Sequence, residues 1–206
     1  MGLYKDFILP RGMDKAMSTA EHQVLREQTT AGLFGDVLEL GFGSGLNVAH
    51  YPDEIERVWV AEPSTVGMAL AAERIDIRGI PIEVVSLDGA CLPLADASID
   101  GALSSWTLCT IPDLQQALAE VRRVLRPGGA LHFVEHGLSG DSKVARWQHR
   151  MNWAQRIYAG GCNLNRPIRQ ELLDAGFEIE SLENFYMGSG FKSQSYIYQG
   201  VARNPR

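Results

Sequence analysis

Short apolar runs alternate with helix-forming segments along most of this chain. Five runs are typical of buried strands, and two more near the C-terminus are separated by a short loop that contains glycine. Strands that alternate with helices are typical of a mainly parallel sheet with right-handed crossovers. The sequence therefore predicts an α/β fold with helices on both faces of a seven-stranded, mostly parallel sheet that ends in a C-terminal antiparallel hairpin. The predicted strands are 36–40, 57–62, 82–88, 100–106, 130–136, 177–186 and 195–203.

The length of 206 residues is enough for one domain with a well-developed core. Apolar residues that recur at three- and four-residue spacing predict the helices. These helices are 13–31, 65–76, 113–125 and 166–176. We expect a single domain 1–206 in four parts: an N-terminal helical cap over 1–35, a ligand-binding core over 36–136, a cap insertion over 137–163, and a helix with the closing hairpin over 164–206.

The net charge of −6 argues against a nucleic-acid partner, which needs a basic surface. No apolar run approaches the length of a membrane span, and the apolar stretch within residues 1–12 is too short for a signal peptide. Cys91, Cys109 and Cys162 are far apart and odd in number, so no paired-thiol metal motif or disulfide framework follows. We therefore expect a cytoplasmic protein with no stable membrane insertion and no metal site.

A glycine-rich turn follows the first predicted strand, in the sequence LELGFGSGLN. Gly41, Gly43 and Gly45 allow the backbone to approach a ligand closely. A phosphate-binding loop would need Lys and Ser or Thr after its last glycine, but Leu46 follows here. A dinucleotide fingerprint would need glycine at this same position. The turn therefore fits neither a nucleoside triphosphate nor a dinucleotide well.

Acidic residues stand at the ends of three successive predicted strands. Glu62 can accept hydrogen bonds from both hydroxyls of a ribose, and Asp88 from the exocyclic amine of an adenine. Glu39, just before the glycine turn, would face a cationic part of the ligand. A pyrophosphate would be repelled by this acid-lined site, whereas a sulfonium and an ammonium would be attracted. Glu39 as a buried acid held by neighbouring amides, and Asp88 as a simple turn cap, are the alternative interpretations.

Several motifs occur in an order that resembles class I S-adenosylmethionine-dependent methyltransferases. They are VLELGFGSGLN, VAEPS, SLDGACLPLADASID, SSWTLCTIPD and VRRVLRPGGALHFVEH. The downstream sequences GGCNLNRP and LLDAGF are similar to the methyltransferase-like thiol S-methyltransferase family of animals and its bacterial relatives. The resemblance implies a Rossmann-like fold and S-adenosyl-L-methionine as the cofactor. The animal enzymes carry an N-terminal hydrophobic anchor that this chain lacks, so their membrane location is not carried over.

The resemblance also assigns roles to single residues at the ends of the strands. It implies that Gly41 and Gly43 contact the amino-acid part of the cofactor and that Glu62, followed by Pro63, binds the ribose. Asp88 with Gly89 would bind the adenine. At the end of the fourth strand, the backbone carbonyl of Ser105 would accept from the cofactor ammonium. The full predicted cofactor set is Glu39, Gly41, Gly43, Glu62, Pro63, Asp88, Gly89 and Ser105.

The catalytic groups are harder to predict than the cofactor site. His136 follows the fifth strand, where the acceptor is expected, and is the candidate general base. Cys109 is expected to be a small core residue, whereas Cys162, in a glycine-rich loop, is a candidate for the lining of a pocket.

Segment 137–163 has one apolar, aromatic stripe and one basic stripe that contains a tryptophan. Three interpretations of this segment stay open: a core-packed helix with a solvated face, a cap over an apolar substrate pocket, and a helix that makes a weak peripheral contact with a membrane.

Together these features predict a methyltransferase that acts on a small, apolar acceptor. A thiol is the first expectation, and a phenol or quinone hydroxyl or a lipid amine comes next. The alternatives are a nicotinamide-dependent oxidoreductase on a related sheet and a non-catalytic cofactor-binding protein. We expect the chain to act as a monomer or homodimer on a small molecule.

Overall fold

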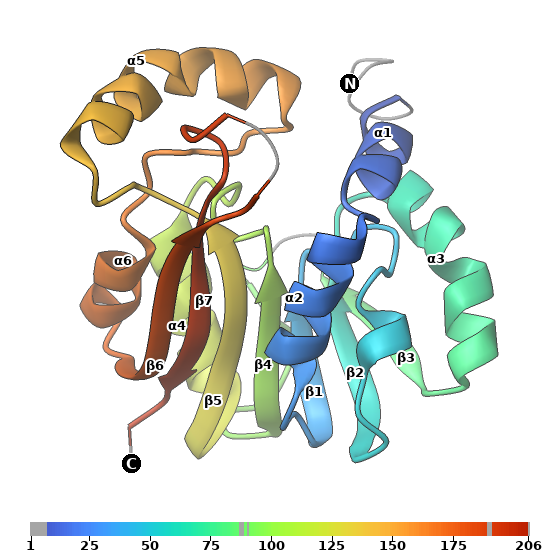
Figure 1. The fold of residues 1–206 in the computed structure, drawn as a ribbon. Coiled ribbons are helices and arrows are strands. Elements are labelled where there is room, and N and C mark those ends of the chain that lie inside the picture. Colours follow the sequence, from blue (N-terminus) through green and yellow to red (C-terminus); the bar gives the residue numbers. More distant parts are fainter. Residues whose placement is uncertain (1–7, 87–88, 90, 189–190, 206) are drawn as a thin grey trace.

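The computed structural model describes residues 8–86, 89, 91–188 and 191–205 and contains a seven-stranded sheet. Its strand order is β3-β2-β1-β4-β5-β7-β6 (Figure 1). The strands are β1 (Gly35–Leu40), β2 (Ile55–Ala61), β3 (Ile82–Ser86), β4 (Ile99–Ser105), β5 (Leu125–His136), β6 (Glu178–Tyr186) and β7 (Tyr196–Arg203). Strands β1 to β5 pair in parallel, and β7 is antiparallel to both β5 and β6. The predicted sheet with its antiparallel hairpin is therefore confirmed.

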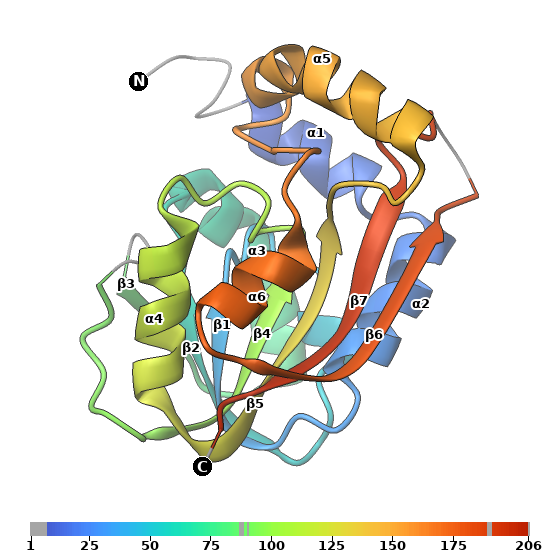
Figure 2. The ribbon, with the colours of Figure 1, turned by 90° about the vertical axis from the view of Figure 1, so that its left-hand side faces the viewer.

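Helices cover both faces of the sheet (Figures 1 and 2). They are α1 (Leu9–Ala16), α2 (Ala20–Thr30), α3 (Thr65–Arg78), α4 (Leu114–Val124), α5 (Ser142–Tyr158) and α6 (Ile168–Asp174), with a short 3₁₀ turn, η2 (Val48–His50). In β1, Leu38 and Leu40 pack with α4 and α6, whereas Val37 packs in the core beneath α3 and η2. Since side chains alternate along a strand, Glu39 shares the face of Val37. Its carboxylate is bound by Asn47 and Tyr51, the residues on either side of η2.

The predicted single helix over 13–31 is wrong, because the structure has two helices there. α1 ends at Ala16, and α2 begins at Ala20. Thr19 is the N-cap of α2, and its hydroxyl accepts a hydrogen bond from the backbone N–H of His22 at 3.5 Å. A Ser or Thr that satisfies a free N–H favours a new helix start over continuation of the old one. The apolar spacing across the break hid this boundary.

Strand β5 begins earlier than predicted, at Leu125 rather than at residue 130. Helix α4 ends at Val124, before the Pro–Gly–Gly sequence that was expected to end it, and this sequence lies within β5. Gly128 adopts a φ of 81°, and backbone hydrogen bonds join Gly128 and Gly129 to Asn204 at 2.9 and 2.8 Å. Pairing with the segment after β7 therefore extends the strand.

Helices α1 and α5 lie over the carboxyl ends of the parallel strands (Figures 1 and 2). This is the edge at which open α/β sheets bind ligands. Among the described residues, no helix has the length and apolar character needed to cross a membrane.

Candidate functional site

The glycine turn after β1 has a backbone that requires glycine. Gly41, Gly43 and Gly45 have φ values of 67°, 56° and 73°, in the left-handed region that other residues rarely adopt. A Cβ atom on Gly41 would also overlap the side chain of Thr107. The turn therefore brings its backbone against the loop that follows β4, at the carboxyl edge of the sheet.

Two cavities of about 350 and 560 Å³ lie on either side of this turn. The smaller one extends beneath α1 and α2, and the larger one extends towards Gly89 and Asp113. The residues that line both cavities are Gly41, Glu62, Pro63, Thr107 and Gly160. The two cavities are thus halves of one crevice with Glu62 between them.

Glu62 is 6% exposed and holds the glycine turn in place. Its two carboxylate oxygens accept hydrogen bonds from the backbone N–H groups of Gly43 and Ser64, both at 2.6 Å. Burial raises the pKa of Glu62, and these two N–H donors oppose the rise. A carboxylate has about four acceptor positions, so Glu62 can accept further hydrogen bonds from a ligand in the crevice.

Glu39 lies behind the crevice and lines neither cavity. It is 1% exposed and accepts hydrogen bonds from the hydroxyl of Tyr51 and from Asn47 Nδ2, the latter at 2.8 Å. Asn47 lines the smaller cavity, and its Oδ1 accepts from Arg26 Nη1 at 2.7 Å. Burial raises the pKa of Glu39 to about 7, and the hydrogen bonds from Tyr51 and Asn47 oppose this rise. Glu39 is therefore linked to the crevice by hydrogen bonds through Asn47 and Arg26, which both line the smaller cavity.

The raised pKa of Glu39 predicts a pH-dependent stability. Between pH 4.5 and about 7 the folded state binds more protons at this residue than the unfolded state does, so the free energy of unfolding should fall as pH rises. Glu39→Gln has the same shape without the charge and should remove this part of the slope. Urea unfolding of both proteins across this pH range provides the measurement. If the free energy of unfolding falls equally steeply with pH in the two proteins, the pKa of Glu39 is not raised in the folded state.

Arg26, on α2, is a residue that the sequence analysis missed. Its guanidinium lies 4.8 Å from the ring centroid of Trp106, and both residues line the smaller cavity. Burial lowers the pKa of Arg26 to about 10, so the side chain stays charged at neutral pH. Among the described residues, Arg26 Nε and Trp106 Nε1 are buried donors without a hydrogen-bond partner. Because unpaired buried donors are costly, these two nitrogens fit an anionic ligand group such as a carboxylate.

Three of the remaining predicted cofactor residues lie along the same crevice. Ser105 lines the smaller cavity, Gly89 the larger one, and Pro63 both. The carbonyl of Ser105 accepts a hydrogen bond from the hydroxyl of Thr107 at 3.2 Å, and a carbonyl oxygen has two lone pairs. Asp88 lies outside the described residues.

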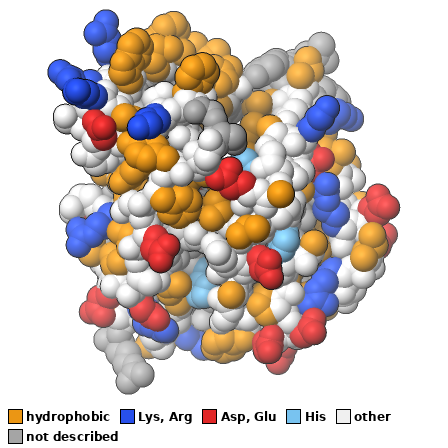
Figure 3. Space-filling model, viewed as in Figure 1, with side chains coloured by type: hydrophobic (Ala, Val, Ile, Leu, Met, Phe, Trp, Pro, Cys, Tyr) orange, Lys and Arg blue, Asp and Glu red, His pale blue; other side chains and the backbone are white. Residues whose placement is uncertain are grey.

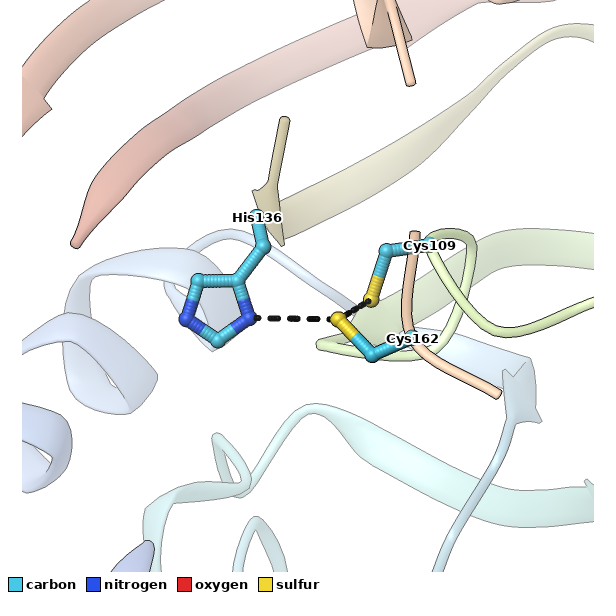
Figure 4. A group of neighbouring side chains, drawn as sticks. All are labelled: Cys109, His136 and Cys162. Carbon is cyan, nitrogen blue, oxygen red and sulfur yellow. Dashed lines mark hydrogen bonds between the residues drawn. The ribbon is translucent and has the colours of Figure 1, made fainter. Parts of the chain in front are cut away.

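His136, the predicted base, lines neither cavity. Its ring centroid lies 6.5 Å from that of Trp106, and its Nδ1 points towards Cys162 Sγ at 4.0 Å (Figure 4). Cys162 and Cys109, both buried, have their sulfur atoms 3.5 Å apart. The hydrogen bond between the two cysteine side chains, together with His136, lowers the pKa of Cys162, and burial opposes this effect. Residues that are distant in sequence thus form one cluster beside the crevice.

The predicted cap segment contributes little to the crevice itself. Of its residues, only Gly160 lines the two cavities. Trp147, Met151 and Tyr158 of α5 instead line a separate, mostly apolar cavity of about 540 Å³, together with Phe191. The aromatic face of α5 is therefore turned away from the glycine turn.

Glu135, at the end of β5, fixes the loop that follows β4 and was also missed. This fully buried carboxylate accepts a hydrogen bond from Ser104 Oγ at 2.7 Å. It also accepts from the backbone N–H groups of Thr107, Leu108 and Cys109 at 3.0 to 3.2 Å. Burial raises its pKa, and these four donors oppose the rise. Glu135 is a positioning residue for the wall of the crevice.

Glu135→Ala should strongly destabilise the protein. The change leaves three backbone donors without an acceptor, and each such donor costs about 1–3 kcal/mol when it is buried. We expect a loss of about 3 kcal/mol or more in the free energy of unfolding, measured by urea denaturation. Glu183→Ala, at an exposed position on β6, is the control and should change stability by less than about 0.5 kcal/mol. Similar losses in both variants would show that Glu135 does not hold the loop.

The sheet order, the glycine turn and the acids at strand ends are typical of class I S-adenosylmethionine-dependent methyltransferases. Residues 38–133 match the family model of a methyltransferase domain, and this match, together with the relatives and structures below, supports a class I S-adenosylmethionine-dependent methyltransferase. S-adenosyl-L-methionine is therefore the cofactor implied for the crevice. The crevice fits it, because the unpaired donors of Arg26 and Trp106 suit its carboxylate and the Glu62 carboxylate suits its ribose.

Curated relatives and solved structures agree with this class. Human thiol S-methyltransferase TMT1A is 30% identical over 151 residues, which cover 72% of this chain and 62% of that protein. Human thiol S-methyltransferase TMT1B is 33% identical over 151 residues, covering 71% and 62%. The chain thus spans less than two thirds of the length of these relatives. A putative methyltransferase from Bacillus halodurans has the same fold, with a TM-score of 0.71, 16% identity and coverage of 89% of this chain and 99% of that chain.

Proposed function

We propose that this chain transfers a methyl group from S-adenosylmethionine to the sulfur of a small, apolar thiol. The observation that carries the proposal is the crevice at the carboxyl edge of the sheet, with Glu62 at its middle and the unpaired donors of Arg26 and Trp106 at one end. The thiol as acceptor is supported by the similarity to thiol S-methyltransferases. A phenol, a quinone hydroxyl and a lipid amine are the next acceptors in order.

In this proposal the two halves of the crevice hold the two ends of the cofactor. The adenosine lies in the larger cavity near Gly89, and the amino-acid part lies in the smaller one. Gly41 and Gly43 bring backbone to the amino-acid part, the Ser105 carbonyl accepts from its ammonium, and Glu62 beside Pro63 binds the ribose. Glu39 holds Asn47 in place behind the site.

The chain's contribution to methyl transfer is positioning and exclusion of water. When bound, the cofactor supplies a methyl group on a sulfonium, whose departure leaves a neutral thioether. The acceptor sulfur forms the new bond to carbon while the old carbon–sulfur bond breaks, and the thiol proton is lost. Leu9, Met13 and Met17 form an apolar wall of the smaller cavity. Holding the reacting atoms in line can lower the barrier by about 7–11 kcal/mol.

The role of His136 as base stays a prediction. A thiol with a pKa near 8.5 is already a few per cent thiolate at neutral pH, so a weak base is sufficient. His136 is half-buried and is the last residue of β5. The ring of Trp106 contacts both His136 and the cavity-lining Arg26 of α2. These positions support a role near the acceptor without a contact to the cofactor.

Incubation with methyl-labelled S-adenosylmethionine and a panel of acceptors tests the proposed function. The panel contains an alkyl thiol, a phenol, a reduced quinone and a lipid amine. We expect label on the alkyl thiol, and none with Glu62→Ala. Label on another acceptor alone would overturn the thiol assignment. Tight cofactor binding without any product would favour a non-catalytic binding protein, and enhanced NAD(P)H fluorescence without S-adenosylmethionine binding would favour an oxidoreductase.

We also propose that α5 rests weakly on an anionic membrane surface. Trp147, Trp153 and Ile157 are 61–67% exposed, and Arg146 and Arg150 are exposed beside them. Figure 3 shows hydrophobic side chains gathered where α5 lies in Figure 1, with Lys and Arg beside them. Exposed aromatic and basic groups on one helix are typical of a helix that lies in a membrane interface. An apolar acceptor would be concentrated there.

Co-sedimentation with lipid vesicles checks the membrane contact. We expect binding to vesicles rich in phosphatidylglycerol that weakens with salt, and little binding to pure phosphatidylcholine. Trp153→Ser should reduce the bound fraction. Ile77→Ser, which changes an apolar residue on α3 that is 79% exposed, should not. Equal losses with both variants, or no binding at low salt, would reject the contact.

A cytoplasmic location, a monomeric or homodimeric state and the absence of a nucleic-acid partner stay predictions from the sequence. The net charge of −6 supports the last of these. Light scattering of the purified protein measures its oligomeric state directly.

A further inference from the structure

Cys109, His136 and Cys162 form a cluster, and the proposed methyl transfer uses neither of its two cysteines. They come from three separate segments: the loop after β4, the last residue of β5 and the loop after α5 (Figure 4). One potential ligand atom from each residue lies within 4.8 Å of the other two. Sequence spacing predicted no metal site, because the fold alone brings these residues together.

We propose that this cluster binds a thiophilic divalent cation, Zn²⁺ in the first place, through two sulfurs and one imidazole nitrogen. A tetrahedral zinc ion with Zn–S bonds of about 2.3 Å and Zn–N bonds of about 2.0–2.1 Å sets its ligand atoms roughly 3.5–3.8 Å apart. The observed separations are 3.5 Å between the two sulfurs and 4.0 Å between Cys162 Sγ and His136 Nδ1. The ligand atoms are therefore nearly in place.

The surroundings hold two of the three ligands in position. The backbone N–H of Cys109 donates to Glu135, and the carbonyl of Cys109 accepts from both the N–H and the Nδ2 of Asn163, at 2.9 and 3.0 Å. These bonds tie the two cysteine loops together beside Leu164 and Ala159. A site whose ligands are already ordered loses little conformational entropy when it binds an ion.

The charge near the cluster also suits a cation with two thiolate ligands. Glu135 contributes a carboxylate and Arg166 one positive charge, and both interact with the Cys109 sulfur. Binding of the ion replaces the thiol protons, which are released to solvent, so no oxidant or reductant is needed. A disulfide between the two cysteines would need an oxidant and would leave His136 without a function in the cluster.

Three protein ligands leave the fourth position of a zinc site to water or another small ligand. The loop that carries Cys162 also contains Gly160, which lines both halves of the crevice. The ion would therefore fix the crevice wall to the sheet through Cys109 and His136. Nδ1 of His136 cannot bind the ion and act as the predicted base at the same time. Measurements with zinc bound and with zinc removed therefore distinguish the two roles.

Metal binding by the purified, reduced protein tests the proposal without any activity assay. After incubation with zinc and desalting, we expect one zinc per chain by elemental analysis. Cobalt(II) in place of zinc should give tetrahedral visible bands and thiolate charge-transfer absorption. Cys162→Ser should weaken zinc binding by more than about 100-fold, because the loss of even an outer-shell group costs about 10- to 100-fold. Cys91→Ser removes an exposed cysteine outside the cluster and should bind as the unchanged protein does.

The controls make each outcome decisive. Circular dichroism and S-adenosylhomocysteine binding report whether Cys162→Ser is folded, and His136→Gln provides a second variant that leaves both cysteines intact. Zinc that exchanges out on desalting, or cobalt spectra without thiolate bands, would overturn the proposal. So would zinc binding that both cluster variants retain. Mass spectrometry that finds a Cys109–Cys162 disulfide in place of metal binding would also reject it.

Discussion

Replacing Glu62 by alanine should weaken the binding of S-adenosylhomocysteine by about 100-fold or more, measured by calorimetry. Glu62 stands between the two halves of the crevice, where its carboxylate is proposed to accept from both ribose hydroxyls. Hydrogen bonds to a charged group contribute about 1.5–3 kcal/mol each, so the loss of two corresponds to at least two orders of magnitude. The variant also frees the N–H groups of Gly43 and Ser64, which should loosen the glycine turn.

Two further variants separate the ligand contact from the effect on the turn. Glu62→Gln keeps the shape and one acceptor oxygen, so its loss of affinity should be smaller than that of Glu62→Ala. Glu56→Ala changes an exposed glutamate on β2, the strand that Glu62 follows, and should bind normally. Normal affinity of Glu62→Ala for S-adenosylhomocysteine would show that Glu62 does not bind the ribose.

Arg26→Met should weaken S-adenosylhomocysteine binding by about 10- to 100-fold, because one charge-assisted interaction with the ligand carboxylate is lost. The same change should leave the binding of methylthioadenosine almost unaltered, since that ligand lacks the amino-acid part. This contrast between two ligands assigns the effect to one end of the crevice. A protein that is merely unfolded would lose both ligands.

Arg57→Met is the matched control for Arg26. Arg57 also stacks on a tryptophan, with its guanidinium 5.0 Å from the ring of Trp59, but it lines neither half of the crevice. Its replacement should leave both affinities unchanged. If Arg26→Met weakens the binding of S-adenosylhomocysteine and methylthioadenosine equally, Arg26 does not bind the carboxylate of the ligand.

Sequence patterns predicted the features of this protein that depend on local order. Apolar runs and the helices between them indicated the parallel sheet, and the carboxyl ends of β1 and β2 carry Glu39 and Glu62 as predicted. The turn with Gly41 and Gly43 was recognisable because glycine adopts its φ values far more readily than other residues do. These features depend on residues that are close together in the sequence, so local patterns are enough to predict them.

Features that depend on packing between distant segments were not predictable in this way. Arg26 reaches the crevice because α2 packs on the sheet and Asn47 accepts its Nη1, 21 residues further along the chain. Glu135 reads as part of a strand, although its carboxylate holds a loop from the neighbouring strand. Cys109 and Cys162 lie 53 residues apart. A polar residue next to an apolar run is a weak signal for each of these contacts.

Direct titration of the purified protein with S-adenosylhomocysteine tests the central claim, that the carboxyl edge of the sheet binds an adenosyl amino acid. Calorimetry should give one molecule bound per chain, and methylthioadenosine should compete for the same site while NADH should not. A complete lack of binding by both S-adenosylhomocysteine and S-adenosylmethionine at millimolar concentration would contradict the account.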